Sequence, residues 1–308
     1  MTVDVVIPSY HPGEKFLKLL SRLEKQETPV NRIIVVNTEE EYWKPDQYER
    51  FSNLEVHHIA KSQFDHGAAR NMGISYSEAD IVVCMTDDAM PADQMLITSL
   101  LEGFSKQGPE GEVVIEVYGR QLPGKDCSTA EQYTRQFNYP EQGRIKTIKD
   151  LDDLGIKTYF ASNVCCAYRR ELFEKLGGFT EKTIFNEDMI FAAKALKAGY
   201  AVCYAADARV VHSHNYTALQ QLHRNFDLGV SQADHPEVFS DVPSEGEGFR
   251  LVRQTVRYLS GKRKFFQIPG LIVNSGCKYI GYRLGKQYCR LPKKIVRQLS
   301  MNKHYWDR

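Results

Sequence analysis

The first half of the chain alternates short apolar runs with helical patterns, and this alternation restricts the fold more than any other feature. Apolar runs occupy 3–7, 32–36, 81–85 and 113–118, with a weaker one at 54–59, and the segments at 16–23, 67–77 and 92–104 carry apolar residues at helical spacing. Uninterrupted apolar runs of this length are typical of parallel strands buried on both faces. The pattern predicts an α/β fold with a mostly parallel sheet flanked by helices.

The middle of the chain continues less regularly. We expect a strand at 160–168, a helix at 170–176 and a second helix at 186–198, whereas 126–153 reads as a polar, partly helical loop region. Residues 234–248 are rich in proline, glycine and acids, which is typical of a linker or an exposed loop.

Polar residues follow three of the apolar runs at the point where each run ends. These segments are Pro8-Ser9-Tyr10, Asn37-Thr38-Glu39 and Thr86-Asp87-Asp88. The carboxyl ends of parallel strands meet at one edge of a sheet, and ligands of open α/β sheets bind beyond that edge. The sequence therefore predicts a ligand site there.

The acidic segment at 86–88 is the most informative of the three. Two carboxylates at the end of a buried strand are costly unless they are paired. A divalent cation that also binds a diphosphate is a suitable partner, because Mg²⁺ and Mn²⁺ both favour oxygen ligands. The alternative is that the acids cap the next helix, which Pro91 at its expected start favours.

Three further segments carry candidate chemistry, each with a structural alternative. At 64–71, Gly67 opens a helix whose N-terminus suits an anion, and Arg70 lies one turn in. Glu187 and Asp188 begin another helix, where acids are favoured for capping, but a carboxylate there can also serve as a general base. His212 and His214 share one face of an extended segment, where either can bind metal or be structural.

Taken together, these segments resemble the family 2 glycosyltransferases, which have the GT-A fold, and most closely their bacterial rhamnosyltransferase branch. The resemblance covers roughly residues 1–230. It rests on Val5-Val6-Ile7-Pro8-Ser9-Tyr10, the Phe64/His66-Gly67/Arg70-Asn71 pattern, Thr86-Asp87-Asp88-Ala89-Met90-Pro91, Ser162-Asn163, Arg169-Arg170, Gly177-Gly178-Phe179, Glu187-Asp188 and His212-Ser213-His214.

The resemblance implies an enzyme that transfers a sugar from a nucleoside diphosphate to an acceptor hydroxyl with inversion. It implies Asp188 as catalytic base beside Glu187, and Asp88 and His212, preferred over His214, as ligands of Mg²⁺ or Mn²⁺. Position 86 is Thr where many members have the first metal-binding Asp. The residues implied for nucleotide-sugar binding are Pro8, Tyr10, Thr38, Glu39, His66, Arg70, Asp87 and Asn163.

The resemblance also points to a donor and an acceptor. It favours dTDP-rhamnose as donor, and a glycan or lipid-linked glycan of bacterial cell-surface polysaccharide as acceptor. A UDP-sugar donor is the main alternative, and a non-catalytic carbohydrate-binding or scaffold protein is a second. A nucleotidyltransferase is disfavoured because no glycine-rich phosphate loop follows the first strand.

The charge of the chain is unevenly distributed, although its net charge is only +1. Residues 250–308 contain 15 lysines and arginines and a single acid, Asp307, mixed with aromatic and aliphatic residues. We therefore expect two parts, a catalytic domain at 1–230 and a linker with a basic helical extension at 231–308. The extension suits either an anionic membrane surface or a packed subdomain that contacts protein. No nucleic-acid-binding motif is present.

The sequence also bears on where the protein works. It has no signal-peptide pattern and no apolar stretch near the ~18 residues of a membrane span. The seven cysteines show no C-x-x-C spacing, which favours free thiols in a reducing compartment. We expect a cytoplasmic protein, with peripheral attachment to the inner face of the cell membrane if the basic extension binds lipid.

Overall fold

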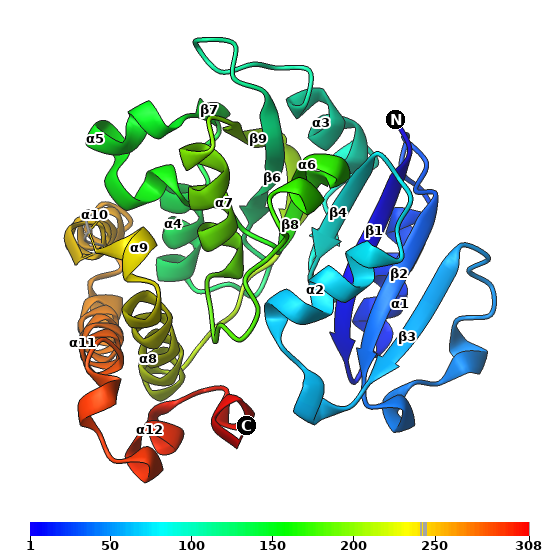
Figure 1. Ribbon diagram of the computed structural model, residues 1–308. Helices are drawn as coiled ribbons and strands as arrows, with labels where there is room; N and C mark the ends of the chain where they lie inside the picture. The colour runs from blue at the N-terminus through cyan, green and yellow to red at the C-terminus, as the bar shows by residue number, and fades with distance from the viewer. Residues whose placement is uncertain (241, 243–244, 308) are drawn as a thin grey trace. The chain divides into compact units, whose positions relative to one another are not determined.

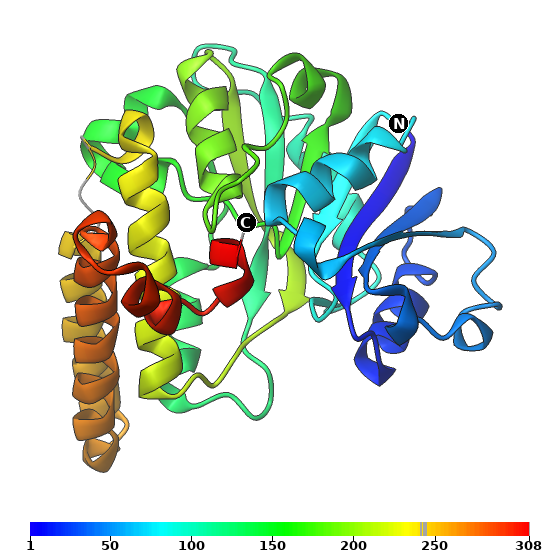
Figure 2. The same cartoon turned by 60° about the horizontal axis from the view of Figure 1, so that its bottom comes forward.

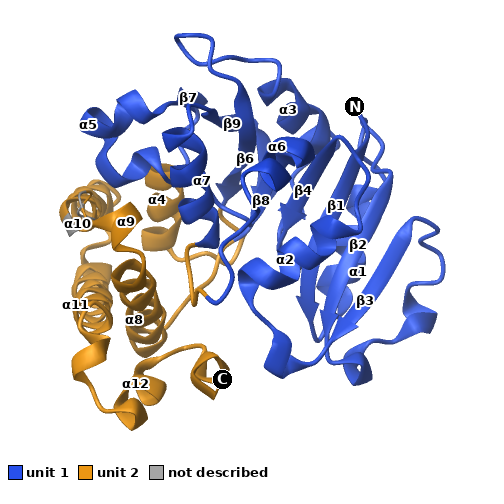
Figure 3. Ribbon diagram, in the orientation of Figure 1, with its two compact units in different colours: residues 1–122, 139–182, 187–212 blue, residues 123–138, 183–186, 213–308 orange. Residues whose placement is uncertain are grey.

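The computed structural model describes residues 1–240, 242 and 245–307, which form two compact units (Figure 3). The first unit comprises residues 1–122, 139–182 and 187–212, and the second comprises residues 123–138, 183–186 and 213–308. The division at residue 230 that the sequence suggested stays a prediction. Each unit is described by itself below.

The first unit is built on one mixed sheet with the strand order β3-β2-β1-β4-β8-β6-β9-β5, and β7 pairs with β9 (Figure 1). The pairs β3–β2, β2–β1 and β1–β4 are parallel, as expected, whereas β8, β5 and β7 each run antiparallel to their neighbours. The strands are β1 Val3–Tyr10, β2 Arg32–Thr38, β3 Leu54–Ile59, β4 Ile81–Met85, β5 Met90–Pro91, β6 Val114–Leu122, β7 Arg144–Lys146, β8 Cys165–Arg169 and β9 Ala201–Val211.

Successive residues of the central strands face opposite sides of the sheet, and both sides are covered by helices. On one side Val5, Ile33 and Val83 join a core with Phe16 and Leu100 of the covering helices. In Figure 1, α2 crosses in front of β1 and β2 while α1 lies behind them. The helices of this unit are α1 Glu14–Leu23, α2 His66–Ser75, α3 Leu96–Gly103, α5 Leu151–Leu154, α6 Arg170–Lys175 and α7 Glu187–Lys197.

Two local expectations are corrected, and one strand was not expected. Pro91 does not open a helix, because Met90–Pro91 form the short strand β5 and α3 begins only at Leu96. The strand expected at 160–168 is confined to Cys165–Arg169. The long strand β9 at 201–211 was not anticipated, because its alanine-rich sequence carries a weak strand signal.

The second unit is helical. Its helices are α4 Thr129–Asn138, α8 Ala218–Asp234, α9 Pro236–Phe239, α10 Glu245–Gly261, α11 Ile268–Gly285 and α12 Lys293–Leu299. The helices expected for the basic C-terminal region are thus confirmed. The predicted linker at 234–248 contains α9 and the start of α10, and its residues 241, 243 and 244 lie outside the described residues. Among the described helices, none combines the length and the hydrophobicity needed to cross a membrane.

Candidate active site

A short strand pair brings the acidic segment next to His212. Met90 and Pro91 of β5 pair antiparallel with Val211 and Val210 of β9. Asp88 lies two residues before β5 and His212 directly follows β9, so the pairing places their side chains together. The distance from Asp88 Oδ1 to His212 Nε2 is 3.4 Å. Both side chains belong to a group whose geometry is suited to hold a metal ion.

The imidazole of His212 is oriented by Gln121. The amide nitrogen of Gln121 donates to Tyr139 Oη at 2.5 Å and to Ser162 Oγ at 3.0 Å. Its carbonyl oxygen therefore faces His212 Nδ1, at 3.1 Å, and accepts the Nδ1 hydrogen. This contact fixes the tautomer in which Nε2 carries the lone pair that a metal needs. His214 follows two residues later and belongs to the second unit.

The neighbouring Asp87 is held at the end of β1. Ser9 Oγ donates to Asp87 Oδ2 at 3.2 Å, and the backbone N–H of Tyr10 also donates to this carboxylate. Burial and the adjacent Asp88 nevertheless raise the pKa of Asp87. A carboxylate pair of this kind favours a nearby cation, since positive charge offsets the repulsion between the two carboxylates.

The carboxyl ends of β1, β2 and β3 form a second part of the site. Pro8 and Thr38 lie at the ends of β1 and β2, and the hydroxyl of Thr38 is buried without a partner among the described residues. Glu39 has a left-handed backbone (φ 64°) and accepts a hydrogen bond from the Lys61 N–H. Tyr10 is 41% exposed, and its hydroxyl accepts from Lys61 Nζ at 3.2 Å. This edge of the sheet thus presents the exposed ring of Tyr10 beside buried polar groups.

The first turn of α7 carries Asp188, which is half-buried. Its Oδ2 accepts from the backbone N–H of Asn163 at 3.0 Å, and its Oδ1 accepts from that of Met189 at 2.8 Å. Burial and the adjacent Glu187 raise the pKa of Asp188 to about 7. Asn163 precedes Val164, whose carbonyl accepts from the Thr86 N–H, so this cluster adjoins the acidic segment.

Glu187, unlike Asp188, is paired with a cation. Arg70 Nη1 lies 3.1 Å from Glu187 Oε1, and Asn163 Nδ2 donates to the same oxygen at 3.1 Å. Burial raises the pKa of Glu187, but Arg70, His66 and Asn163 outweigh that effect and hold the pKa below its usual value. Tyr168 Oη donates to Asn163 Oδ1 at 2.7 Å and completes this network of hydrogen bonds. Two adjacent acids with opposite pKa shifts are a common arrangement for acid–base chemistry.

The residues at the start of α2 have structural roles. From the sequence alone these roles could not be distinguished from ligand binding. Asp65 caps the helix, accepting from the N–H groups of Gly67 and Ala68 at 3.1 and 2.9 Å. A Cβ on Gly67 would lie 2.3 Å from the carbonyl oxygen of Thr180, so the glycine permits close packing of this backbone. Arg70, expected to face a diphosphate, is only 4% exposed and contacts Glu187 and the His66 carbonyl.

The Arg70–Glu187 pair leads to a prediction about stability. Arg70→Ala should lower the free energy of unfolding by about 3–5 kcal/mol, because it leaves a buried carboxylate without its cation. Arg297→Ala, which breaks an exposed pair with Asp307, is the matched control and should cost less than about 1 kcal/mol. Urea unfolding measures both. Equal losses in the two variants would contradict a buried pair.

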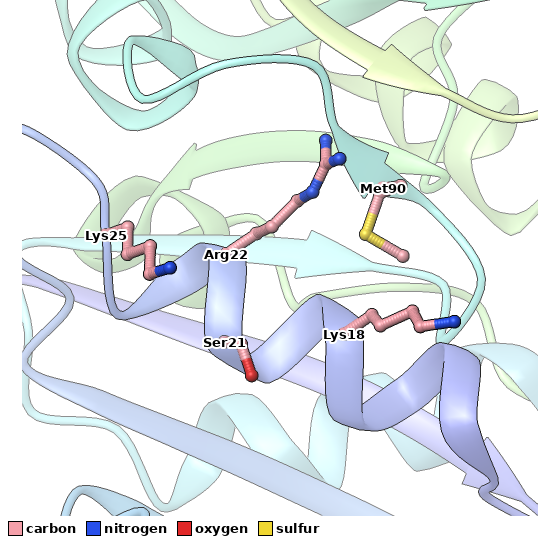
Figure 4. Close-up of a pocket in the computed structure, with 5 residues that line it drawn as sticks. All are labelled: Lys18, Ser21, Arg22, Lys25 and Met90. Atoms are coloured by element: carbon pink, nitrogen blue, oxygen red, sulfur yellow. The ribbon is translucent and has the colours of Figure 1, made fainter.

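A surface pocket of about 390 Å³ lies elsewhere in the first unit (Figure 4). It is lined by Lys18, Ser21 and Arg22 of α1, by Lys25 just after that helix, and by Met90. The guanidinium of Arg22 donates to the Pro91 carbonyl and so supports β5. None of the residues expected to bind donor or metal lines this pocket.

The fold therefore gathers most of the predicted residues into neighbouring clusters of the first unit. Asp88 lies beside His212, Asp87 beside Ser9, and Asp188 beside Glu187 and Asn163. Sequence reasoning missed Gln121, Ser9 and Tyr168 as supporting residues. Gln121 and Ser9 carry a recognisable signal, since both are polar residues near the carboxyl end of a strand.

The mixed sheet, with carboxylates and a histidine beyond its strand ends, has the GT-A fold. Solved structures support the fold. The mannosyltransferase PcManGT from Pyrobaculum calidifontis, in complex with GDP-Man and Mn²⁺, has a TM-score of 0.56 at 16% identity, over 99% of this chain and 84% of that one. TarS 1–349 from S. aureus, in complex with UDP-GlcNAc, has a TM-score of 0.54 at 16% identity, over 94% of this chain and 92% of that one.

The chain belongs to glycosyl transferase family 2, whose family model matches residues 4–177. It is 37% identical to the O-antigen chain rhamnosyltransferase RfbN of Salmonella typhimurium, over 100% of this chain and 96% of that one. It is also 37% identical to the O-antigen chain rhamnosyltransferase WbaN of Salmonella anatum, over 98% of this chain and 95% of that one. The resemblance stated from the sequence is thereby confirmed at the level of family and fold.

Proposed function

We propose that this glycosyltransferase is a metal-dependent, inverting rhamnosyltransferase. It transfers rhamnose from dTDP-rhamnose to a hydroxyl of a glycan or lipid-linked glycan in the synthesis of a bacterial cell-surface polysaccharide. The observation that carries the proposal is the full-length similarity to two O-antigen chain rhamnosyltransferases. The opposite pKa shifts of Asp188 and Glu187 support the assignment of a base.

Asp88 and His212 are the proposed metal ligands. Their atoms supply one carboxylate oxygen and one imidazole nitrogen, and Gln121 holds that nitrogen in the correct tautomer. This mixed donor set fits Mn²⁺ better than Mg²⁺, which strongly favours oxygen ligands. When bound, the ion neutralises negative charge on the leaving diphosphate.

Asp188 is the proposed catalytic base. Two backbone N–H groups hold its carboxylate, so that its geometry does not depend on flexible side chains. A pKa of about 7 leaves the carboxylate basic enough to take a proton from an acceptor hydroxyl and yet largely ionised just above neutrality. Glu187 stays ionised beside it and anchors the turn through Arg70.

The nucleotide is proposed to lie across the ends of β1 and β2. Tyr10 offers its exposed ring to the base, and Thr38, Glu39 and Pro8 line the ribose. The buried Thr38 hydroxyl, which lacks a partner among the described residues, supports a polar ligand there. His66, Arg70, Asp87 and Asn163 would lie toward the diphosphate and the sugar, Arg70 through its contact with Glu187.

Thermal shift with a panel of nucleotide sugars tests the donor. We expect dTDP-rhamnose with Mn²⁺ to raise the unfolding temperature by a few degrees, because a ligand that binds only the folded state stabilises it. The shift should be smaller without Mn²⁺. A shift with UDP-sugars alone would favour the alternative donor class. The absence of any shift across the panel would favour a non-catalytic carbohydrate-binding or scaffold protein.

A further inference from the structure

Helix α11 of the second unit has an inner side that packs tightly on α8 (Figure 2). A Cβ on Gly281 would lie 2.2 Å from the Leu222 carbonyl oxygen, and one on Gly285 would lie 2.1 Å from that of Phe226. The absence of side chains at these two positions lets the helix backbones approach closely. This close contact holds α11 in a defined orientation and determines which of its sides faces outward.

The outer side of α11 is also apolar, and it is exposed. Ile272, Val273, Tyr279 and Ile280 belong to α11, and Phe265 and Phe266 belong to the 3-10 turn Phe265–Gln267 that directly precedes it. These six side chains, called here the outer face, are 45–77% exposed. Isolated exposed apolar residues are common on soluble proteins, but six large ones on a single helix and the turn that leads into it mark an interaction surface.

Cations flank the outer face along the sequence. Lys262, Arg263 and Lys264 directly precede its two phenylalanines, and Arg283 follows Ile280 by less than one turn. Arg253 and Arg257 are exposed on α10, and no acid occurs between 250 and 306. A surface that combines exposed rings with cations complements an interface that is apolar within and anionic at its rim.

We propose that the outer face of α11 docks on an anionic lipid surface, with its apolar side chains in the interface and the exposed cations Lys262 and Arg263 at the headgroups. A second copy of the chain is a poorer occupant, because a symmetric contact would bring the same cations against each other. The helix lies on the membrane and does not cross it, in keeping with the hydropathy of the described helices. Such docking would keep a cytoplasmic enzyme beside a lipid-linked acceptor.

Vesicle binding of the full chain tests this proposal without any sugar, so its result is separate from that of the donor panel. We expect binding to vesicles of 3:1 phosphatidylcholine and phosphatidylglycerol, and much weaker binding to pure phosphatidylcholine. Lys262→Gln/Arg263→Gln should weaken binding about 25-fold, since each cation near an anionic surface contributes about fivefold. Phe266→Ser/Val273→Ser/Ile280→Ser should weaken it at least about tenfold.

Two matched controls separate this surface from general effects. Lys15→Gln/Lys18→Gln on α1 removes the same charge from exposed positions and should leave vesicle binding within about twofold of that of the unmodified chain. Leu219→Ser removes a side chain that is 62% exposed on α8 and should likewise have little effect. Circular dichroism verifies that each variant is folded.

Three outcomes would overturn the proposal. The first is equal binding to neutral and anionic vesicles, or none to either. The second is an equal loss of binding in the α1 control and in Lys262→Gln/Arg263→Gln. The third is a concentration-dependent dimer of the unmodified chain that Phe266→Ser/Val273→Ser/Ile280→Ser converts to a monomer, which would assign the outer face to a second copy.

Discussion

Asp188→Asn is expected to lower kcat for sugar transfer by about a thousandfold, the range associated with loss of a general base. Asparagine has nearly the same shape, and its side-chain oxygen can still accept the hydrogen bond from Asn163 or from Met189. It cannot take a proton from the acceptor hydroxyl. Steady-state transfer from the donor measures the loss, and KM for the donor should change little because Asp188 acts on the acceptor.

The pH dependence of the unmodified enzyme provides an independent check on the same residue. Burial and Glu187 raise the pKa of Asp188 to about 7, so the carboxylate is protonated below that pH. Since a base acts only when deprotonated, kcat should fall about tenfold for each pH unit below 7 and level off above it. Near-normal transfer by Asp188→Asn, or a rate independent of pH between 5 and 8, would refute the assignment.

Asp88→Ala is expected to cause the second large loss, about a hundredfold or more in kcat, together with loss of Mn²⁺ dependence. The reason is that Asp88 supplies the carboxylate oxygen that lies 3.4 Å from His212 Nε2. Titration of Mn²⁺ into the protein with donor nucleotide, followed by calorimetry, measures binding apart from turnover.

Variants of the two histidines serve as the comparison. His212→Ala should resemble Asp88→Ala in both binding and turnover, because Gln121 orients this imidazole toward the carboxylate. His214→Ala should have the smaller effect. If His214→Ala abolished Mn²⁺ binding while His212→Ala did not, the assignment of His212 would be wrong. If Asp88→Ala retained full Mn²⁺ affinity, no metal would be held here.

Much of the fold followed from local patterns. The apolar runs at 3–7, 32–36 and 81–85 predicted central strands because such runs are stable only when buried on both faces. β9 escaped prediction because Ala201–Val211 owes its conformation to pairing with β6 and β7 and carries only a weak local preference. Pro91 was misread for a related reason, since a proline in a two-residue strand and a proline at a helix start look alike in sequence.

The candidate site likewise contains residues that the sequence predicted and partners that only the fold supplied. Asp87, Asp88 and Thr38 were predicted as site residues from the sequence because they are polar residues at the ends of predicted strands, and these roles stay predictions. The partners of these residues were not predictable. Arg70 was expected to face a ligand, whereas the fold pairs it with Glu187, far away in the chain. Gln121 gained its role only because β6 ends beside His212.

The sequence by itself determined the alternation of strands and helices, the polar residues at the strand ends and the family. These features are local, since they depend on hydrophobic periodicity and residue type over short stretches. Only the tertiary structure decided that Asp88 meets His212, that Glu187 is neutralised by Arg70, and that Asp188 therefore remains the acid with a raised pKa. Such outcomes depend on burial and on charges that are distant in sequence, and neither is defined until the chain has folded.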